Sequence, residues 1–323
     1  MAVALPCIGF VGVLHSLGAA RGAPHTPTKA RSTNPKAVDA PAVSLAPPDA
    51  IGPFHLPPTS GEGQWRPVGR RVDNLPAVYE TTVRLPSNAA AGAGIAWMDT
   101  KLLRARLYSG SLSPGGLFWK YTAPISPAAS QTLVAAFNGG FLLKDTNGGY
   151  FSERHLVAPL RTGAASLVIF KNGSATVGEW GRDLAMTPAV VAVRQNLTLL
   201  IDHGQPVAGL NPNDVSTWGV SLHGVVDTWR SGLGETANGA LVYVSGQMTI
   251  VDLADILARA GSVRAMVLDM NPNWTVFSIY APTSGSGAAS PSNGSDLLPA
   301  MLQTPARFFE PAYSRDFVTM SAP

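Results

Sequence analysis

The stretch "TIVDLADILARAGSVRAMVLD", Thr249 to Asp269, predicts a helix followed directly by a buried strand. Thr249 is suited to cap the helix, because Asp252 follows three residues later at the capping-box spacing, and Gly261 is a typical C-terminal stop. Four apolar residues repeat with the period of one helical face: Leu253, Ile256, Leu257 and Ala260. The strand Ala265 to Leu268 follows. This unit therefore delivers the carboxyl group of Asp269 to the end of a buried strand.

Most of the remaining chain shows the alternation and turn residues of short strands. Leu133 to Phe137 has the composition of a buried strand, and Ser166 to Phe170 begins a hairpin that turns at Asn172-Gly173. A second turn between strands is predicted at Asn238-Gly239. Many strands with few helices indicate the α+β class, with strand-rich mixed sheets in a single domain over residues 62–323.

Two further segments lie within that domain. The range 283–295 is rich in glycine, serine and proline, and we expect a loop there. The sequence "RDFVTM" near the end predicts a closing strand.

The first 61 residues differ in composition from the rest. "AVALPCIGFVGVLHSLGAA", Ala2 to Ala20, resembles the apolar part of a secretory signal, so we assign residues 1–20 to a signal peptide or N-terminal anchor. Residues 21–61 are rich in proline and alanine and predict an extended linker. We therefore expect a secreted or cell-envelope protein that meets the membrane only through its N-terminal segment.

Composition narrows the function classes. The chain of 323 residues is 46% hydrophobic and 13% charged, which describes a protein with a sizeable core. The net charge of +3 comes without a dense Lys/Arg cluster, so we predict no nucleic-acid partner. The single cysteine, Cys7, can form neither a disulfide framework nor a thiolate metal site.

Metal ligands are also few. The histidines His155, His203 and His223 lack the i, i+4 spacing of a helical zinc site. Calcium held by loop carboxylates stays open, although no motif supports it. We therefore predict no cofactor.

Three segments share one pattern, a strand followed by a polar turn that carries a functional side chain. They are "AAFNGGF" with Asn138, "TWRSGLGE" with Arg230 and Glu235, and "VLDMNPNW" with Asp269. Loops at strand ends are a common way to present functional groups on a rigid scaffold. Each segment alone also fits an ordinary turn, surface charge or cap.

The order and spacing of these motifs resemble those of the phosphodiester glycosidase family, which includes a lysosomal enzyme that uncovers mannose 6-phosphate by removing N-acetylglucosamine. An Asn-Gly-Gly-aromatic motif is matched by Asn138 to Phe141, and an Arg-(Thr/Ser)-x-x-Gly motif by Arg230 to Gly234. A helix leading to a strand that ends in Leu-Asp is matched by Thr249 to Asp269. The similarity extends from about Trp65 to Met320.

The chain departs from the family after the acid. The family has a run of glycines there, whereas this chain has Met270-Asn271-Pro272-Asn273-Trp274, with Thr275 at the place of the family's threonine. Glycines would let the backbone approach an anion, and proline removes one N–H donor. Trp274 offers an apolar face for a sugar, and Asn271 and Asn273 offer donors and acceptors. Alternatively, Trp274 is part of the core and the asparagines only shape a turn.

The resemblance implies an exported hydrolase that cleaves a glycosidic bond in a cell-envelope glycan or a sugar phosphodiester. Glycoside cleavage generally uses two carboxyl groups, for which we predict Asp269 and Glu235, with Asp145, Glu153 and Asp227 in reserve. Arg230 would hold a phosphate or carboxylate of the substrate, and Asn138 with Gly139 would contact the sugar. The stereochemical outcome stays open. The alternative is a domain without catalysis that binds glycans or assists envelope assembly.

Overall fold

A computed structural model describes residues 44–323 except 117–118, 147, 222–223 and 284–286. The predicted signal segment and residues 21–43 of the predicted linker lie outside the described residues. Among the residues described, no helix is both long enough and apolar enough to span a membrane. The fold below concerns residues 44–323, which belong to one of the chain's two compact units.

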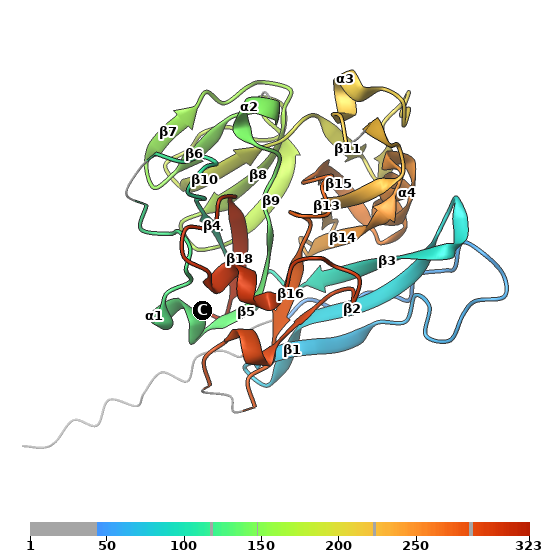
Figure 1. Cartoon of the computed structure of the whole chain (residues 1–323), viewed down its shortest axis with the longest axis horizontal. Helices are drawn as coiled ribbons and strands as arrows, with labels where there is room; N and C mark the ends of the chain where they lie inside the picture. The colour runs from blue at the N-terminus through green and yellow to red at the C-terminus, as the bar shows by residue number, and fades with distance from the viewer. Residues whose placement is uncertain (1–43, 117–118, 147, 222–223, 284–286) are drawn as a thin grey trace, which may run out of the picture. The chain divides into compact units, whose positions relative to one another are not determined.

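The described strands form three antiparallel sheets (Figure 1). The eight-stranded sheet contains, in spatial order, β1 (Arg66–Val72), β2 (Leu75–Leu85), β3 (Asn88–Met98), β14 (Leu241–Met248), β13 (Thr228–Thr236), β15 (Ser262–Val267), β11 (Leu199–Asp202) and β12 (Gln205–Pro206). The β10 sheet contains β7 (His155–Ala158), β6 (Tyr150–Ser152), β10 (Val190–Gln195), β8 (Ala165–Phe170) and β9 (Ala175–Glu179). The β5 sheet contains β17 (Gly294–Asp296), β16 (Phe277–Tyr280), β5 (Leu133–Asn138), β18 (Phe317–Ser321) and β4 (Arg104–Tyr108).

The helices are short. They are α1 (Pro127–Ser130), α2 (Leu143–Thr146), α3 (Val215–Trp218), α4 (Ile250–Arg259) and the 3₁₀ turns η2 (Pro291–Asn293) and η3 (Pro305–Phe309). The α+β, strand-rich class predicted from the sequence is confirmed.

One central core lies between the three sheets. It takes side chains from each of them, among them Met266 of β15, Tyr150 of β6 and Phe137 of β5. The opposite face of the eight-stranded sheet is covered by α4, whose Leu253 and Leu257 are fully buried. Each sheet thus buries alternate residues on the central side, as a strand's period of two requires.

The helix α4 forms as the sequence predicts. The Thr249 hydroxyl accepts from the Asp252 N–H at 3.1 Å, and the Asp252 carboxylate accepts from the Thr249 N–H, which completes the capping box. Gly261 adopts a φ of +86° just after the helix, a conformation in which glycine is unstrained. The Asp252 carboxylate also accepts from the N–H and hydroxyl of Ser87, so one acid joins the helix to the β2–β3 turn.

The predicted hairpins are present. β8 and β9 pair around Asn172-Gly173, and β13 and β14 pair around Asn238-Gly239. The closing strand is β18. The loop expected over 283–295 is corrected in its described part, because η2 and the start of β17 lie within it and Ile279 pairs with Ser295.

The ordered domain also begins earlier than residue 62. Leu45 and Ile51 are buried, and the Leu45 N–H donates to the Asp99 carboxylate at 2.7 Å. Glu62, also buried, accepts from Arg84 of β2. The proline-rich composition of 44–61 suggested a free linker, but its few apolar and acidic residues dock onto the eight-stranded sheet.

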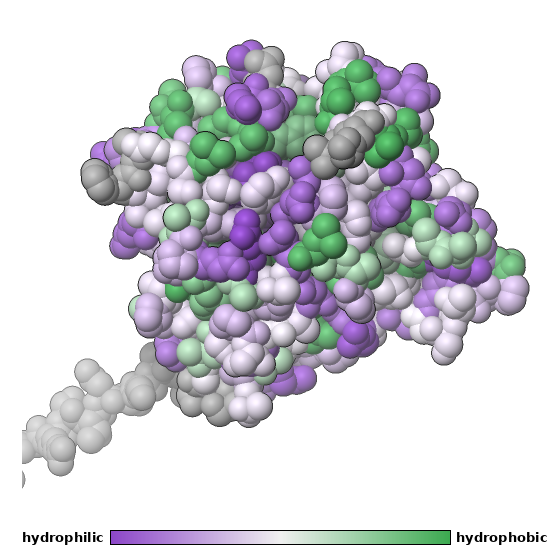
Figure 2. Space-filling view, in the orientation of Figure 1, coloured by the Kyte–Doolittle hydropathy of each residue, from purple (hydrophilic) through white to green (hydrophobic). Residues whose placement is uncertain are grey.

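The surface is mixed. In Figure 2, hydrophobic residues gather over the part of the face where Figure 1 places β7, α2 and α3, which agrees with the exposed side chains of Leu156, Val157, Val215 and Val220. Hydrophilic residues cover much of the remaining face, as expected where it meets water.

We expect Asp252→Ala to lower the free energy of unfolding by about 1–2 kcal/mol, because it removes the capping-box partner of Thr249 and the two hydrogen bonds from Ser87. Urea unfolding followed by circular dichroism measures this. Asp255→Ala on the same helix is the control, since no hydrogen bond involves that side chain among the described residues. Equal losses for the two variants would contradict the role given to Asp252.

Candidate active site

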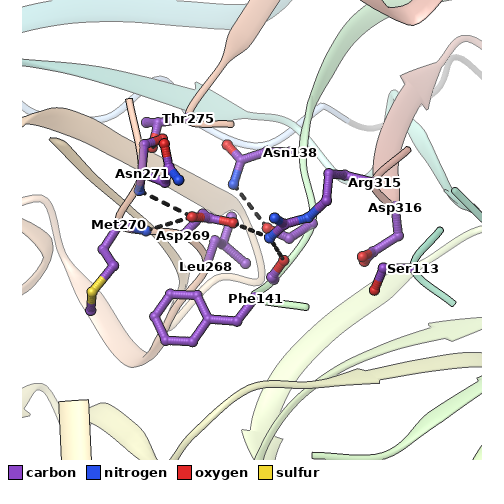
Figure 3. A network of polar contacts seen from close by, with 12 residues as sticks. Ser113, Asn138, Phe141, Leu268, Asp269, Met270, Asn271, Thr275, Arg315 and Asp316 are labelled. Carbon is purple, nitrogen blue, oxygen red and sulfur yellow. Dashed lines mark hydrogen bonds and ion pairs between the residues drawn. The ribbon is translucent and has the colours of Figure 1, made fainter. Parts of the chain in front are cut away.

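A β-bulge presents Asp269. The N–H of Leu268 donates to the Ser231 carbonyl, and the N–H of Ser231 donates to the Asp269 carbonyl, so two residues lie opposite one residue of β13. Such a bulge re-aims the side chain that follows it. The Ser231 hydroxyl accepts from the Asp269 N–H and from the Asn138 amide, so these residues lie close together. The Asp269 carboxyl group points toward Arg315 (Figure 3).

The Asp269 carboxylate is buried and held from two sides (Figure 3). One oxygen accepts from the N–H groups of Met270 at 2.8 Å and Asn271 at 3.1 Å, and the other pairs with Arg315 at 2.5 Å. Its residue is 3% exposed. Burial raises the pKa of Asp269 to about 7, while the Arg315 charge and the two N–H groups oppose that rise. This carboxyl group can therefore exchange a proton near neutral pH.

Asn138 is linked to Asp269 through Ser231, and its amide is fully occupied. Its oxygen accepts from the Tyr243 hydroxyl at 2.8 Å and the Val276 N–H at 3.1 Å. Its nitrogen donates to the Gly139 carbonyl and the Ser231 hydroxyl. An amide has two donors and two acceptor sites. Asn138 therefore has no free group for a sugar hydroxyl, and it joins β5 to β13 and β14 instead.

The two glycines after Asn138 allow close packing. A Cβ atom on Gly139 would lie 2.0 Å from the Asp316 carboxylate, and one on Gly140 would lie 3.0 Å from the Arg194 guanidinium. Arg194 and Asp316 form a fully buried ion pair at 2.8 Å, and Arg194 also donates to the Phe141 carbonyl. Neither glycine has a positive φ. The motif is therefore required by space and not by a left-handed turn, and Gly139 contacts the protein where we predicted a sugar.

The turn after Asp269 is held by local hydrogen bonds. The Asn271 carbonyl accepts from the N–H groups of Trp274 and Thr275, and the Asn271 side chain accepts from the Asn273 N–H at 2.9 Å. Thr275 is fully buried and donates to the Asn271 carbonyl, whereas Asn273 is exposed. Of the predicted binding residues, Asn271, Asn273 and Trp274 thus keep some exposure and Thr275 does not.

Trp274 belongs to a cluster of aromatic and cationic side chains beside Asp269. The Arg315 guanidinium lies 5.0 Å from the Trp274 ring centre, and that of Arg307 lies 5.6 Å from it. Tyr313 is 6.2 Å from Trp274, centre to centre. The Tyr313 hydroxyl, Arg315 Nε and Arg307 Nε are buried without a hydrogen-bond partner among the described residues. Three unpaired donors therefore surround one half-buried ring.

Arg230 is not brought to Asp269. It precedes Ser231 on β13, so its side chain points to the opposite face of the sheet. There it donates to the carbonyls of Met248 and Val226, and burial lowers the pKa of Arg230 to about 10. No hydrogen bond or ion pair joins Arg230 to Asp269 among the described residues.

Glu235 is corrected as the second acid. It lies four residues beyond Ser231 on β13, roughly 13 Å at the usual rise per residue. Its carboxylate accepts from the Thr176 hydroxyl at 2.6 Å and the Val177 N–H at 3.0 Å, which ties β13 to β9. The two carboxyl groups of glycosidases lie about 5–10 Å apart. Glu235 therefore serves as a link between sheets.

The reserve acids lie elsewhere. Asp145 and Asp227 are exposed, and Glu153 accepts from the N–H groups of Lys120 and Tyr121 at 2.9 Å each. Within the described ranges, no group of three or more His, Cys, Asp or Glu side chains could hold a metal ion. The acid whose charge acts on Asp269 is Asp316, which is occupied by Arg194.

Sequence reasoning missed Arg315, Asp316 and Arg194. The dipeptide Arg315-Asp316 was visible as adjacent opposite charges at the start of the closing strand. Because successive side chains of a strand point to opposite faces, two neighbouring charges there need separate partners on the two faces. That signal points to two buried partners, which here are Asp269 and Arg194.

The comparison with protein families gives a match to phosphodiester glycosidase over residues 131–270. The resemblance drawn from the sequence is thereby confirmed over a range that contains Asn138, Arg230 and Asp269. The matched range ends at Met270, the first residue of the altered turn.

Solved structures with a similar arrangement are distant in sequence. The catalytic domain of zebrafish N-acetylglucosamine-1-phosphodiester alpha-N-acetylglucosaminidase, auto-inhibited by its pro-peptide, matches with a TM-score of 0.47 and 16% identity over 80% of this chain and 88% of that chain. A hypothetical protein from Synechocystis matches at 0.42 and 12% over 80% and 64%, and a Burkholderia pseudomallei protein described as exported at 0.37 and 14% over 72% and 74%. No curated protein matches the chain.

We expect Gly139→Ala to destabilise the protein by about 3 kcal/mol, because its methyl group would overlap the carboxylate of the buried Arg194–Asp316 pair. Gly52→Ala is the matched control. No atom lies within 4 Å of its added Cβ, and we expect a change below about 1 kcal/mol. Chemical denaturation measures both, and similar values for the two variants would refute the packing explanation.

We expect the stability contributed by Asp269 to fall as the pH rises from about 4 to 7. The unfolded chain, with a carboxyl pKa near 3.8, has released this proton by pH 4, whereas the folded protein keeps it until about pH 7. Stability is then lost at about 1.4 kcal/mol per pH unit. Measured at pH 4, 5.5 and 7, the unfolding free energy of wild type should fall along that slope relative to that of Asp269→Asn, which lacks the titrating group. Parallel pH profiles would contradict it.

Proposed function

We propose that the protein hydrolyses the bond between a sugar and a phosphate in a sugar phosphodiester, with Asp269 as the acid/base group. The observation that carries the proposal is the buried carboxyl group of Asp269, whose pKa is raised to about 7 beside Arg315. An acid/base catalyst works best when its pKa lies near the working pH. The family match over residues 131–270 supports the same reaction class.

Asp269 has no second available acid beside it among the described residues, and this favours a phosphate over an alcohol as the leaving group. The alkoxide of a sugar or another alcohol is a poor leaving group, so glycosidases protonate the leaving oxygen with a second acid. Among the described residues, the acid whose charge acts on Asp269 is Asp316, and Arg194 already pairs with it. A phosphate monoester, with a second pKa of roughly 6, leaves without such help. One carboxyl group, that of Asp269, is therefore enough for a phosphodiester.

The proposed reaction uses Asp269 as a base. Its carboxylate takes a proton from water, the water oxygen bonds to the anomeric carbon, and the bond from that carbon to the phosphate oxygen breaks. The phosphate leaves as a monoester. Arg315 and the Tyr313 hydroxyl, which has no partner among the described residues, are suited to bind phosphate oxygens. Trp274 supplies a partly exposed apolar face for the sugar ring.

Export is part of the proposal. It is supported by the apolar segment Ala2 to Ala20 and would place the enzyme among cell-envelope glycans.

A second candidate is a glycan-binding domain without catalysis. The feature that favours it is the turn Met270 to Trp274, which replaces the glycines expected from the family. In that case Trp274 and Asn273 would contact a sugar, while Asp269 would serve only to hold the turn through the N–H groups of Met270 and Asn271.

We expect the wild-type protein to release sugar from methyl diesters of sugar 1-phosphates, with N-acetylglucosamine 1-phosphate as the first to be tried. Asp269→Asn should lower kcat about 10²–10⁴-fold, because it removes the proton acceptor. Released reducing sugar is the measurement. An aryl glycoside without phosphate, presented in parallel, should be a much poorer substrate.

Asp296→Asn is the control, because Asp296 is also a half-buried acid with a pKa raised to about 6 by burial, yet it bonds to Ser278 on the β16–β17 pair. Its activity should stay within about twofold of wild type. If wild type releases no sugar from the diesters but binds them equally well with and without the Asp269 carboxylate, the binding domain is the correct description.

A further inference from the structure

A cavity lies away from Asp269, between the β5 and β10 sheets. Its volume is about 500 Å³, within the range of small-molecule sites. Its walls are β4, the end of β18, the strand β10 and the turn between β8 and β9. The Ala105 N–H donates to the Gly173 carbonyl at 2.8 Å, which fixes that turn against β4.

The cavity carries positive charge. Arg104, Arg106 and Lys171 line it, against one acid, Glu153, which gives a formal side-chain charge of 3 − 1 = +2. No carboxylate pairs with any of the three cations among the described residues. Glu153 is occupied by two backbone N–H groups.

The cations differ in how they are held. Arg104 donates to the carbonyls of Lys101 and Leu103 and has a structural role. The Arg106 guanidinium lies 4.1 Å from the centre of the Tyr121 ring, which orients it without using its N–H donors. Arg106 and Lys171 therefore keep their donors for a ligand.

Free hydroxyl groups line the same cavity. Ser152 and Thr319 are each 3% exposed, and Ser321 is half-buried. No hydrogen bond joins these three hydroxyls to another described side chain or carbonyl. Hydroxyls that are both donors and acceptors suit the hydroxyls of a sugar.

We infer that this cavity binds a phosphorylated monosaccharide. The side-chain charge of +2 complements a phosphate monoester, which carries about −1.5 to −2 at pH 7. Arg106 and Lys171 bind the phosphate, and Ser152, Thr319 and Ser321 bind the sugar hydroxyls. The site is distinct from the proposed active site, since Thr319 lies four residues beyond Arg315, roughly 13 Å along an extended chain.

Isothermal titration calorimetry of the full chain with glucose 6-phosphate tests the inference, with glucose and inorganic phosphate as the separate halves of the ligand. Glucose 6-phosphate should bind at least tenfold more tightly than either half. Arg106→Gln and Lys171→Gln should each weaken it about tenfold, because each removes a charged hydrogen bond. Both side chains are exposed and make no hydrogen bond, so unchanged thermal unfolding should confirm that the variants fold.

Lys101→Gln is the matched control, because it removes a charge close to Arg104 without lining the cavity, and its affinity should stay within about twofold of wild type. Asp269→Asn should leave this affinity unchanged whether or not the hydrolase proposal holds. The inference is overturned if glucose 6-phosphate does not bind, if inorganic phosphate binds equally well, if Arg106→Gln and Lys171→Gln have no effect, or if Asp269→Asn abolishes binding.

Discussion

The amide of Asn138 is the contact on which the rest of the site depends. It is 2% exposed and lies where β5 meets the eight-stranded sheet. Burying an amide without partners costs several kcal/mol, so each of its four hydrogen bonds has to be kept. Those bonds fix Ser231 and Tyr243 on one sheet and Val276 on the other. Ser231 in turn forms the bulge that positions Asp269: its carbonyl accepts from the Leu268 N–H, its N–H donates to the Asp269 carbonyl, and its hydroxyl accepts from the Asp269 N–H.

Two neighbouring charges extend this constraint. Arg315 and Asp316 precede β18 and point to opposite sides, one to Asp269 and the other to Arg194. Buried ion pairs are weak sources of net stability, but removing one partner is strongly destabilising because the other charge stays buried. The pairs therefore act mainly to fix geometry. The pair Arg194–Asp316 also explains Gly139-Gly140, since a larger residue would collide with Asp316 at position 139 and with Arg194 at position 140.

Local features could be predicted from the sequence, and long-range partners could not. The helix α4, its cap Thr249 and the turn at Gly173 follow from patterns a few residues long. The pair Arg194–Asp316 spans 122 residues and leaves no such pattern. Glu235 was favoured because it is close in sequence to the arginine motif, but four residues of strand place it well beyond the bulge. Proximity along a strand is thus a poor guide to a shared site.

The altered turn after Asp269 changes how an anion would be held in the proposed reaction. A run of glycines can wrap backbone N–H groups around a phosphate. Here Pro272 lacks that donor, and the N–H groups of Met270 and Asn271 are spent on Asp269 itself. Phosphate binding must then pass to side chains, and the unpaired donors of Arg315 and Tyr313 lie beside the same turn. Because guanidinium binds phosphate with paired hydrogen bonds, the loss of glycines is compatible with hydrolysis.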